Sequence, residues 1–115
     1  MKRAIIFALL CLLPLPAVAD EPVGACSWVD GRLLLYNGTP SVRIWPRGTH
    51  RLLGVVNRSG GSEGPGVLPV SVERLNPSFD RGVWGRFRAC PLTKQRRGWM
   101  QFVYLTDARD LTARP

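Results

Sequence analysis

The stretch ACSWVDGRLLLYNGTPSVRIWPRGTHRLLGVV, residues 25–56, decides the fold, because short apolar runs alternate in it with turn-forming residues. The predicted strands are residues 25–29, 32–36, 41–45 and 50–56. The predicted turns are Asp-Gly at 30–31, Asn-Gly-Thr-Pro at 37–40 and Pro-Arg-Gly-Thr at 46–49. Asp-Gly is a preferred dipeptide for a two-residue hairpin, so the pattern predicts an antiparallel meander.

The second half of the chain adds a glycine-rich loop, one ambiguous segment and a final strand pair. Residues 57–66 predict an exposed loop, and residues 67–75 fit either a strand or a short helix beginning at Pro69. The remaining predicted elements are strands at 84–91 and 99–106, a basic loop at 93–98 and one helical turn at 107–112. The sequence therefore predicts an all-β domain, a small antiparallel sandwich or partly open barrel of six to seven strands, with room for one short helix.

The first 19 residues, MKRAIIFALLCLLPLPAVA, have the three parts of an export signal. A positively charged start is followed by a short apolar run, two prolines and the small residues Ala17 and Ala19. This run is shorter than the about 20 residues that a membrane-spanning helix needs. We expect cleavage after Ala19, a single exported domain over residues 20–115, no transmembrane span in the mature chain, and a periplasmic or secreted location.

Cleavage would leave two cysteines, Cys26 and Cys90. An even pair in an oxidising compartment predicts a disulfide, which would add roughly 4 kcal/mol of stability because the closed loop is long. Strand parity conflicts with burial of this bridge, since Cys90 would share a face with Arg88 rather than with Phe87. The bridge then needs either a β-bulge that reorients Cys90 or a position where the strand ends.

No catalytic or metal-binding pattern stands out in the sequence. Residues 60–64 fit the G-x-S-x-G motif, but they lie in a glycine-rich loop, and the only histidine, His50, precedes the serine. Two distant cysteines with no histidine-rich surroundings match no metal-ligand spacing. We therefore expect a protein that is not an enzyme and that has no cofactor and no metal.

The chain is strongly basic, with Lys+Arg 16 against Asp+Glu 8, and loss of Lys2 and Arg3 with the leader leaves a net charge of +6. Arginine beside aromatic residues can bind anions through guanidinium forks and stacking. The same arginines can instead stack on tryptophans as cation–π pairs on a solvated surface. The candidate anion-binding residues are Arg86, Arg88, Lys94, Arg96, Arg97 and Trp99.

Two stretches resemble a group of small exported bacterial proteins of unknown function. The first covers residues 26–55, and the second covers residues 87–105 with FRACPLT and WMQFVYL. The resemblance implies a shared export route and fold, and it implies no activity. Three functions compete: a non-enzymatic envelope module that binds an anionic component or a protein, a structural or inhibitory protein that docks to another protein, and an enzyme without a recognisable site.

Overall fold

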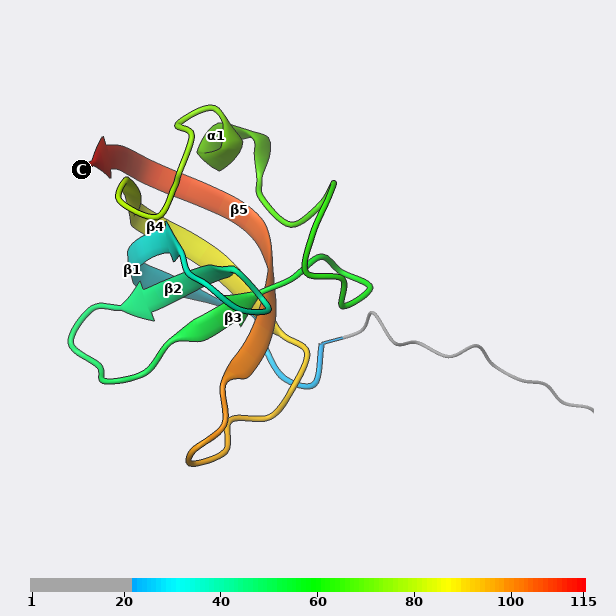
Figure 1. Cartoon of the computed structure of the whole chain (residues 1–115). Coiled ribbons are helices and arrows are strands. Elements are labelled where there is room, and N and C mark those ends of the chain that lie inside the picture. Colours follow the sequence, from blue (N-terminus) through cyan, green and yellow to red (C-terminus); the bar gives the residue numbers. More distant parts are fainter. Residues whose placement is uncertain (1–21) are drawn as a thin grey trace, which may run out of the picture.

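A computed structural model describes residues 22–115, so the predicted leader lies outside the described residues. The elements are β1 (Ser27–Leu35), β2 (Val42–Pro46), β3 (Leu53–Val55), α1 (Val70–Glu73), β4 (Gly82–Pro91) and β5 (Gln101–Arg114). The strands close into a barrel in the order β1-β2-β3-β5-β4 (Figure 1). The predicted all-β fold is confirmed, but the predicted number of strands is wrong, since five strands form the barrel.

Four of the five strand pairs are antiparallel, and the pair between β3 and β5 is parallel. The prediction of a wholly antiparallel sheet is wrong for this pair. The long loop and α1 after β3 lead the chain to β4, which pairs with β1, and β5 then returns between β4 and β3 and runs parallel to β3. This five-stranded closed barrel is similar in architecture to OB-type Greek-key barrels. In Figure 1, α1 lies at one end of the barrel and the β4–β5 loop projects from the opposite end.

Alternating side chains fill the barrel. Leu33 on β1, Ile44 on β2 and Phe87 on β4 are fully buried, whereas their neighbours along each strand face outward. This is the period of two that a half-buried strand requires. Val72 of α1 is also fully buried and belongs to the same core cluster. The ambiguous segment 67–75 therefore contains a short helix, which packs on the barrel.

The predicted Asp-Gly hairpin at residues 30–31 is wrong, because β1 runs through it without a turn. Gly31 pairs with Pro46 of β2 on one side and with Gly85 of β4 on the other. A Cβ atom on Gly31 would overlap the backbone carbonyl of Trp45. The glycine thus allows close approach of a neighbouring backbone in a small barrel, a use that sequence alone does not separate from a turn.

The predicted helical turn at residues 107–112 is also wrong, since β5 continues to Arg114. The pairing between β4 and β5 shifts register twice, and at each shift β5 has one more residue than β4. Asp110 lies in the first of these irregularities with φ of 56°, a left-handed conformation that Asp tolerates. These extra residues break the alternation of side chains by which the strand would be recognised.

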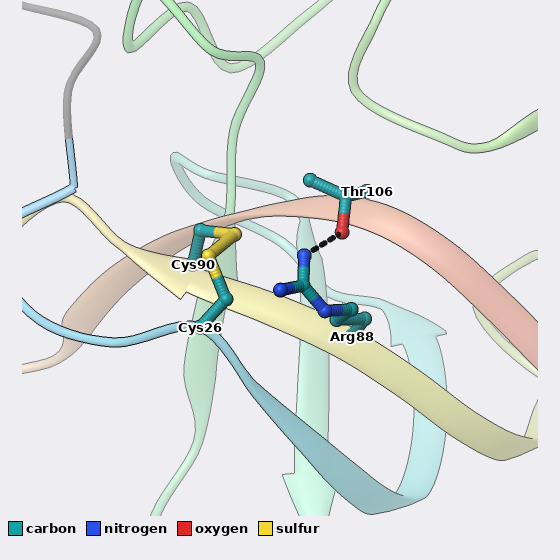
Figure 2. Close-up of a disulfide and its surroundings, with 4 residues drawn as sticks. All are labelled: Cys26, Arg88, Cys90 and Thr106. Atoms are coloured by element: carbon teal, nitrogen blue, oxygen red, sulfur yellow. Dashed lines mark hydrogen bonds between the residues drawn. A yellow bond between two sulfur atoms is a disulfide. The ribbon is translucent and has the colours of Figure 1, made fainter.

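The predicted disulfide between Cys26 and Cys90 is confirmed, with a Cα–Cα distance of 4.1 Å. It joins the residue just before β1 to the end of β4 (Figure 2). The register shift at Arg88 and Ala89 lies next to the bridge, and β4 ends at Pro91. The β-bulge and the strand end, either of which would allow the bridge to form, are therefore both present, and Cys90 is buried with 1% exposure.

Candidate anion-binding site

The structure divides the six candidate anion-binding residues between two environments. Lys94, Arg96, Arg97 and Trp99 lie in the β4–β5 loop, whose residues 93–99 are all exposed. Arg86 and Arg88 instead lie within β4, on the outside of the barrel wall. The basic hairpin that the sequence indicates is therefore two separate features.

Hydrogen bonds at the base of the β4–β5 loop fix where it leaves the barrel. The Leu92 amide donates to the Phe102 carbonyl over 2.8 Å, and the Phe102 amide donates to the Thr93 hydroxyl over 2.8 Å. Nearer the tip, the Trp99 amide donates to the Arg96 carbonyl over 3.0 Å. The loop is thus a structured hairpin, and it presents Trp99 to solvent with 67% exposure.

Two hollows adjoin this loop and share Arg96 and Trp99 in their linings. The cationic groove, of about 570 Å³, lies between the loop and Arg51, and Arg97 and Gln101 also line it. The apolar recess, of about 480 Å³, is lined by Thr93, Lys94, Arg96, Trp99, Met100 and Phe102. We use the name loop site for these two hollows together.

Arg51 is held at the edge of the cationic groove. Its Nη1 donates to Oε1 of Gln101 over 3.1 Å, and Nε2 of Gln101 donates to the Thr93 carbonyl over 3.0 Å. This chain of hydrogen bonds links the β2–β3 connection to the base of the β4–β5 loop. Arg51 therefore lines the same hollow as Arg96 and Arg97, although it is far from them in sequence.

No carboxylate lines either hollow of the loop site. Among residues 22–115, none of its basic side chains takes part in a salt bridge. Four positive charges gather there without a counterion from the described part of the chain. Such a site attracts anions, because guanidinium and ammonium groups form strong charge-assisted hydrogen bonds to phosphate, sulfate or carboxylate oxygens.

Arg86 and Arg88 have partners within the barrel wall. The guanidinium carbon of Arg86 lies 5.0 Å from the centre of the Trp28 ring, and its Nη1 lies 3.9 Å from the Asp110 carboxylate. Nη1 of Arg88 donates to the Thr106 hydroxyl over 3.0 Å, beside the disulfide (Figure 2). The surroundings of Arg86 match the alternative interpretation of a cation–π pair on a solvated face, whereas Arg88 is held by a hydrogen bond and contacts no tryptophan ring within residues 22–115.

A second basic and aromatic surface, which the sequence did not reveal as one cluster, covers the outside of β1, β2, β4 and β5. We call it the outer Arg–Trp face, and it comprises Trp28, Arg32, Trp45, Arg47, Trp84, Arg86, Arg109 and Arg114. Trp45 and Trp84 meet edge to face with ring centres 6.0 Å apart. Arg32 lies between them, 5.8 Å from the first ring and 5.7 Å from the second.

Carboxylates accompany the arginines of the outer Arg–Trp face. Nε of Arg47 lies 3.3 Å from Asp30, and Nη2 of Arg109 lies 3.1 Å from Asp107. The outward positions of β1, at Trp28, Asp30 and Arg32, follow a period of two. This alternation indicates that the three side chains share one face of a strand. The predicted turn at Asp30-Gly31 divided the strand, so the shared face was not predicted.

The residues with a catalytic appearance do not gather around one another. Residues 60–64 lie in the loop between β3 and α1, and His50 is exposed in the β2–β3 connection. Ser62 lines a small hollow of about 220 Å³ with Glu63 and Glu73, and His50 is not part of its lining. Within residues 22–115, no three His, Cys, Asp or Glu side chains are grouped so that they could hold a metal ion.

No helix among the described residues is long and apolar enough to cross a membrane. In comparisons with known proteins, no family model, no curated protein and no solved structure matches the chain. The resemblance to small exported bacterial proteins therefore stays a prediction. The geometry of the loop site carries the functional argument.

Proposed function

We propose that this chain is an exported, non-enzymatic binding module that takes up an anionic component of the cell envelope at its loop site. Export is part of the proposal and rests on the leader of residues 1–19. The ligand class is a molecule with clustered phosphate, sulfate or carboxylate groups. The role of the protein is recognition, since the loop site presents charge and an indole and no nucleophile with a base beside it.

One observation carries this proposal: the loop site concentrates Arg51, Lys94, Arg96 and Arg97 without a carboxylate in its lining. A surface that needs arginine only for solubility disperses its charges or pairs them with acids. Like charges gathered in one hollow repel each other, and a bound anion relieves that repulsion. The exposed Trp99 beside them adds an apolar surface on which a ligand can pack.

The architecture gives independent support by analogy. In OB-type barrels, the β1–β2 and β4–β5 loops commonly contact oligonucleotide or oligosaccharide ligands. The loop site here includes the β4–β5 loop. Fold analogy alone does not identify a function, so the charges and the exposed indole remain the main argument.

The test is retention on immobilised heparin, a sulfated polysaccharide, with elution by a salt gradient. We expect the double variant Arg96→Ala/Arg97→Ala to elute at clearly lower salt than the parent, because each lost contact removes a salt-dependent increment of affinity. The matched control is Arg58→Ala/Arg74→Ala, which removes the same charge from exposed positions outside the loop site. This control should elute close to the parent.

Equal shifts for both double variants would contradict the proposal, because retention would then depend on net charge alone. Thermal unfolding of each variant shows whether the fold is retained. Residues 96 and 97 are exposed and make no salt bridge within the described chain, so we expect melting temperatures near that of the parent.

A further inference from the structure

The loop site has two chemically different halves, and this difference narrows the class of ligand. Arg51, Arg97 and Gln101 line only the cationic groove, whereas Met100 and Phe102 line only the apolar recess. Arg96 and Trp99 line both. A ligand that uses the whole site therefore presents anionic groups and apolar groups next to each other.

The apolar half has a firm support in the barrel wall. Met100 and Phe102 pack over Gly54 of β3, where a Cβ atom would lie 2.9 Å from Sδ of Met100 and 3.0 Å from Cδ1 of Phe102. Both side chains are only partly buried. The recess is thus a stable apolar surface at the end of the barrel, continuous with the exposed ring of Trp99.

The cationic half lies within reach of the same surface. The guanidinium carbon of Arg96 is 4.9 Å from the centre of the Trp99 ring. Lys94 and Arg96 contribute to the lining of the apolar recess and still carry charged ends. Long basic side chains that cover apolar surface with their stems and keep their charge in water are suited to a boundary between water and hydrocarbon.

From these contacts we propose that the loop site docks on the surface of an anionic lipid bilayer, with Trp99 in the interfacial layer and the arginines on lipid phosphates. The inference rests on the proposed function and names the partner for the same site. Tryptophan and basic residues together are typical of protein segments that lie in the headgroup region of membranes. The β4–β5 loop projects from one end of the barrel, so it reaches a flat surface without hindrance from α1 (Figure 1).

A soluble polyanion fits the site less completely. It would neutralise Arg51, Arg96 and Arg97 but would leave the apolar recess in water. A single-stranded nucleic acid could stack a base on Trp99, yet Arg96 already lies over this ring. A bilayer surface satisfies both halves at once, because phosphates and acyl chains meet within a short depth.

The experiment compares binding to phosphatidylglycerol vesicles with binding to phosphatidylcholine vesicles of equal size, measured by sedimentation. We expect binding to the anionic vesicles and little binding to the zwitterionic ones. Arg96→Ala/Arg97→Ala should bind about 30-fold more weakly, since each basic residue near an anionic surface contributes a factor of about five in affinity. Trp99→Ala should bind about tenfold more weakly through loss of apolar contact.

Depth is measured with vesicles that contain lipids brominated on the acyl chain, which quench nearby indoles. The signal of Trp99 is the difference between the parent and Trp99→Phe, because the other three tryptophans are half-buried in the outer Arg–Trp face. We expect quenching of this difference signal on anionic vesicles. Arg58→Ala/Arg74→Ala again serves as the control of equal charge, and its vesicle binding should stay within a few-fold of the parent.

Each outcome separates the lipid proposal from the proposed function. If heparin retention depends on the loop but the protein does not bind vesicles, the lipid proposal is overturned and anion binding stands. The same holds if the protein binds vesicles but Trp99 is not quenched. If a single-stranded oligonucleotide displaces the protein from vesicles at a lower concentration than polyphosphate does, nucleic acid is the partner and the lipid proposal is overturned. If the parent protein is neither retained on heparin nor bound to vesicles, both proposals are overturned.

Discussion

The loop site and the outer Arg–Trp face contain the same residue types and differ in how those residues are paired. On the outer face, Arg32 lies between two indole rings, and Arg47 lies 4.9 Å from the Trp84 ring and 3.3 Å from Asp30. In the loop site, Trp99 is 67% exposed and no carboxylate lines the hollows. Composition alone would assign both regions to one class, but local pairing separates them.

This difference has a physical consequence for each region. A guanidinium that already contacts an indole and a carboxylate must give up these contacts before it binds another anion. Arginines in the loop site have no carboxylate to give up, although Arg51 donates to Gln101 and Arg96 lies over the Trp99 ring. We therefore expect the outer Arg–Trp face to contribute mainly to stability and the loop site mainly to binding.

The largest expected effect comes from removing the disulfide, which ties β1 to β4 and so joins the two central strands of the outer Arg–Trp face. Cys26→Ala/Cys90→Ala should lower the free energy of unfolding by about 4 kcal/mol, because the unfolded chain regains the freedom of a long loop. Urea unfolding with and without reductant measures this. Under conditions in which the variant is folded, it should be retained on heparin as the parent is.

An unchanged urea midpoint in this variant would show that the bridge does not hold the barrel wall. A folded variant that loses heparin retention would show that the loop site depends on the bridge, and the two regions would then not be independent. Reductant should affect the parent and leave the double variant unchanged, which separates loss of the bridge from general chemical effects.

The second effect concerns Arg32, the arginine between Trp45 and Trp84. Arg32→Ala should lower the free energy of unfolding by about 1.5 kcal/mol, through loss of two cation–π contacts and of the packing of its stem. Its heparin retention should match that of Arg74→Ala, which removes one charge elsewhere. Chemical unfolding beside heparin elution measures both quantities.

For Arg96→Ala/Arg97→Ala we expect the reverse pattern, with stability retained and retention reduced. If Arg32→Ala instead kept full stability and lost retention beyond its charge control, the outer Arg–Trp face would be a binding surface. The two variants together thus test whether pairing decides the role of an arginine in this protein.

Much of the barrel could be predicted from alternation of side chains. Residues 41–45 and 84–91 lie close to observed strands because buried apolar positions in them recur every second residue. Residues 32–36 are a continuous apolar run followed by turn residues, and most of them lie in β1. The predictions are wrong where a glycine or an extra strand residue is required by contacts that exist only in the folded barrel. Gly31 mimics a turn because its purpose, contact with the Trp45 backbone, exists only in the closed barrel.

The candidate site could be predicted only in part, for a related reason. Lys94, Arg96, Arg97 and Trp99 stand together in sequence and remain together in the loop site. Arg51 joins them through Gln101, a contact across fifty residues that no local pattern indicates. Arg86 and Arg88 are close to the loop in sequence, yet the direction of β4 carries Arg86 to Trp28 and Arg88 to Thr106.

Within the outer Arg–Trp face, the smallest expected loss of stability comes from its carboxylates. Replacing Asp30, Asp107 and Asp110 by Asn leaves their size and most hydrogen bonding in place, and Asn also tolerates the positive φ of residue 110. Exposed ion pairs contribute little, so we expect the triple variant to lose less than about 1 kcal/mol of unfolding free energy. Thermal and urea unfolding measure this loss.

The binding result of this triple variant is the sharper test. Made in the Arg96→Ala/Arg97→Ala background, it should recover part of the heparin retention, because Arg47, Arg86 and Arg109 lose the acids beside them. The matched control neutralises three exposed acids that, within residues 22–115, form no salt bridge with these arginines: Glu63→Gln, Glu73→Gln and Asp80→Asn. Equal recovery in both variants would mean that total charge governs retention. Recovery confined to the outer-face variant would mean that neighbouring carboxylates are what keep these arginines from binding anions.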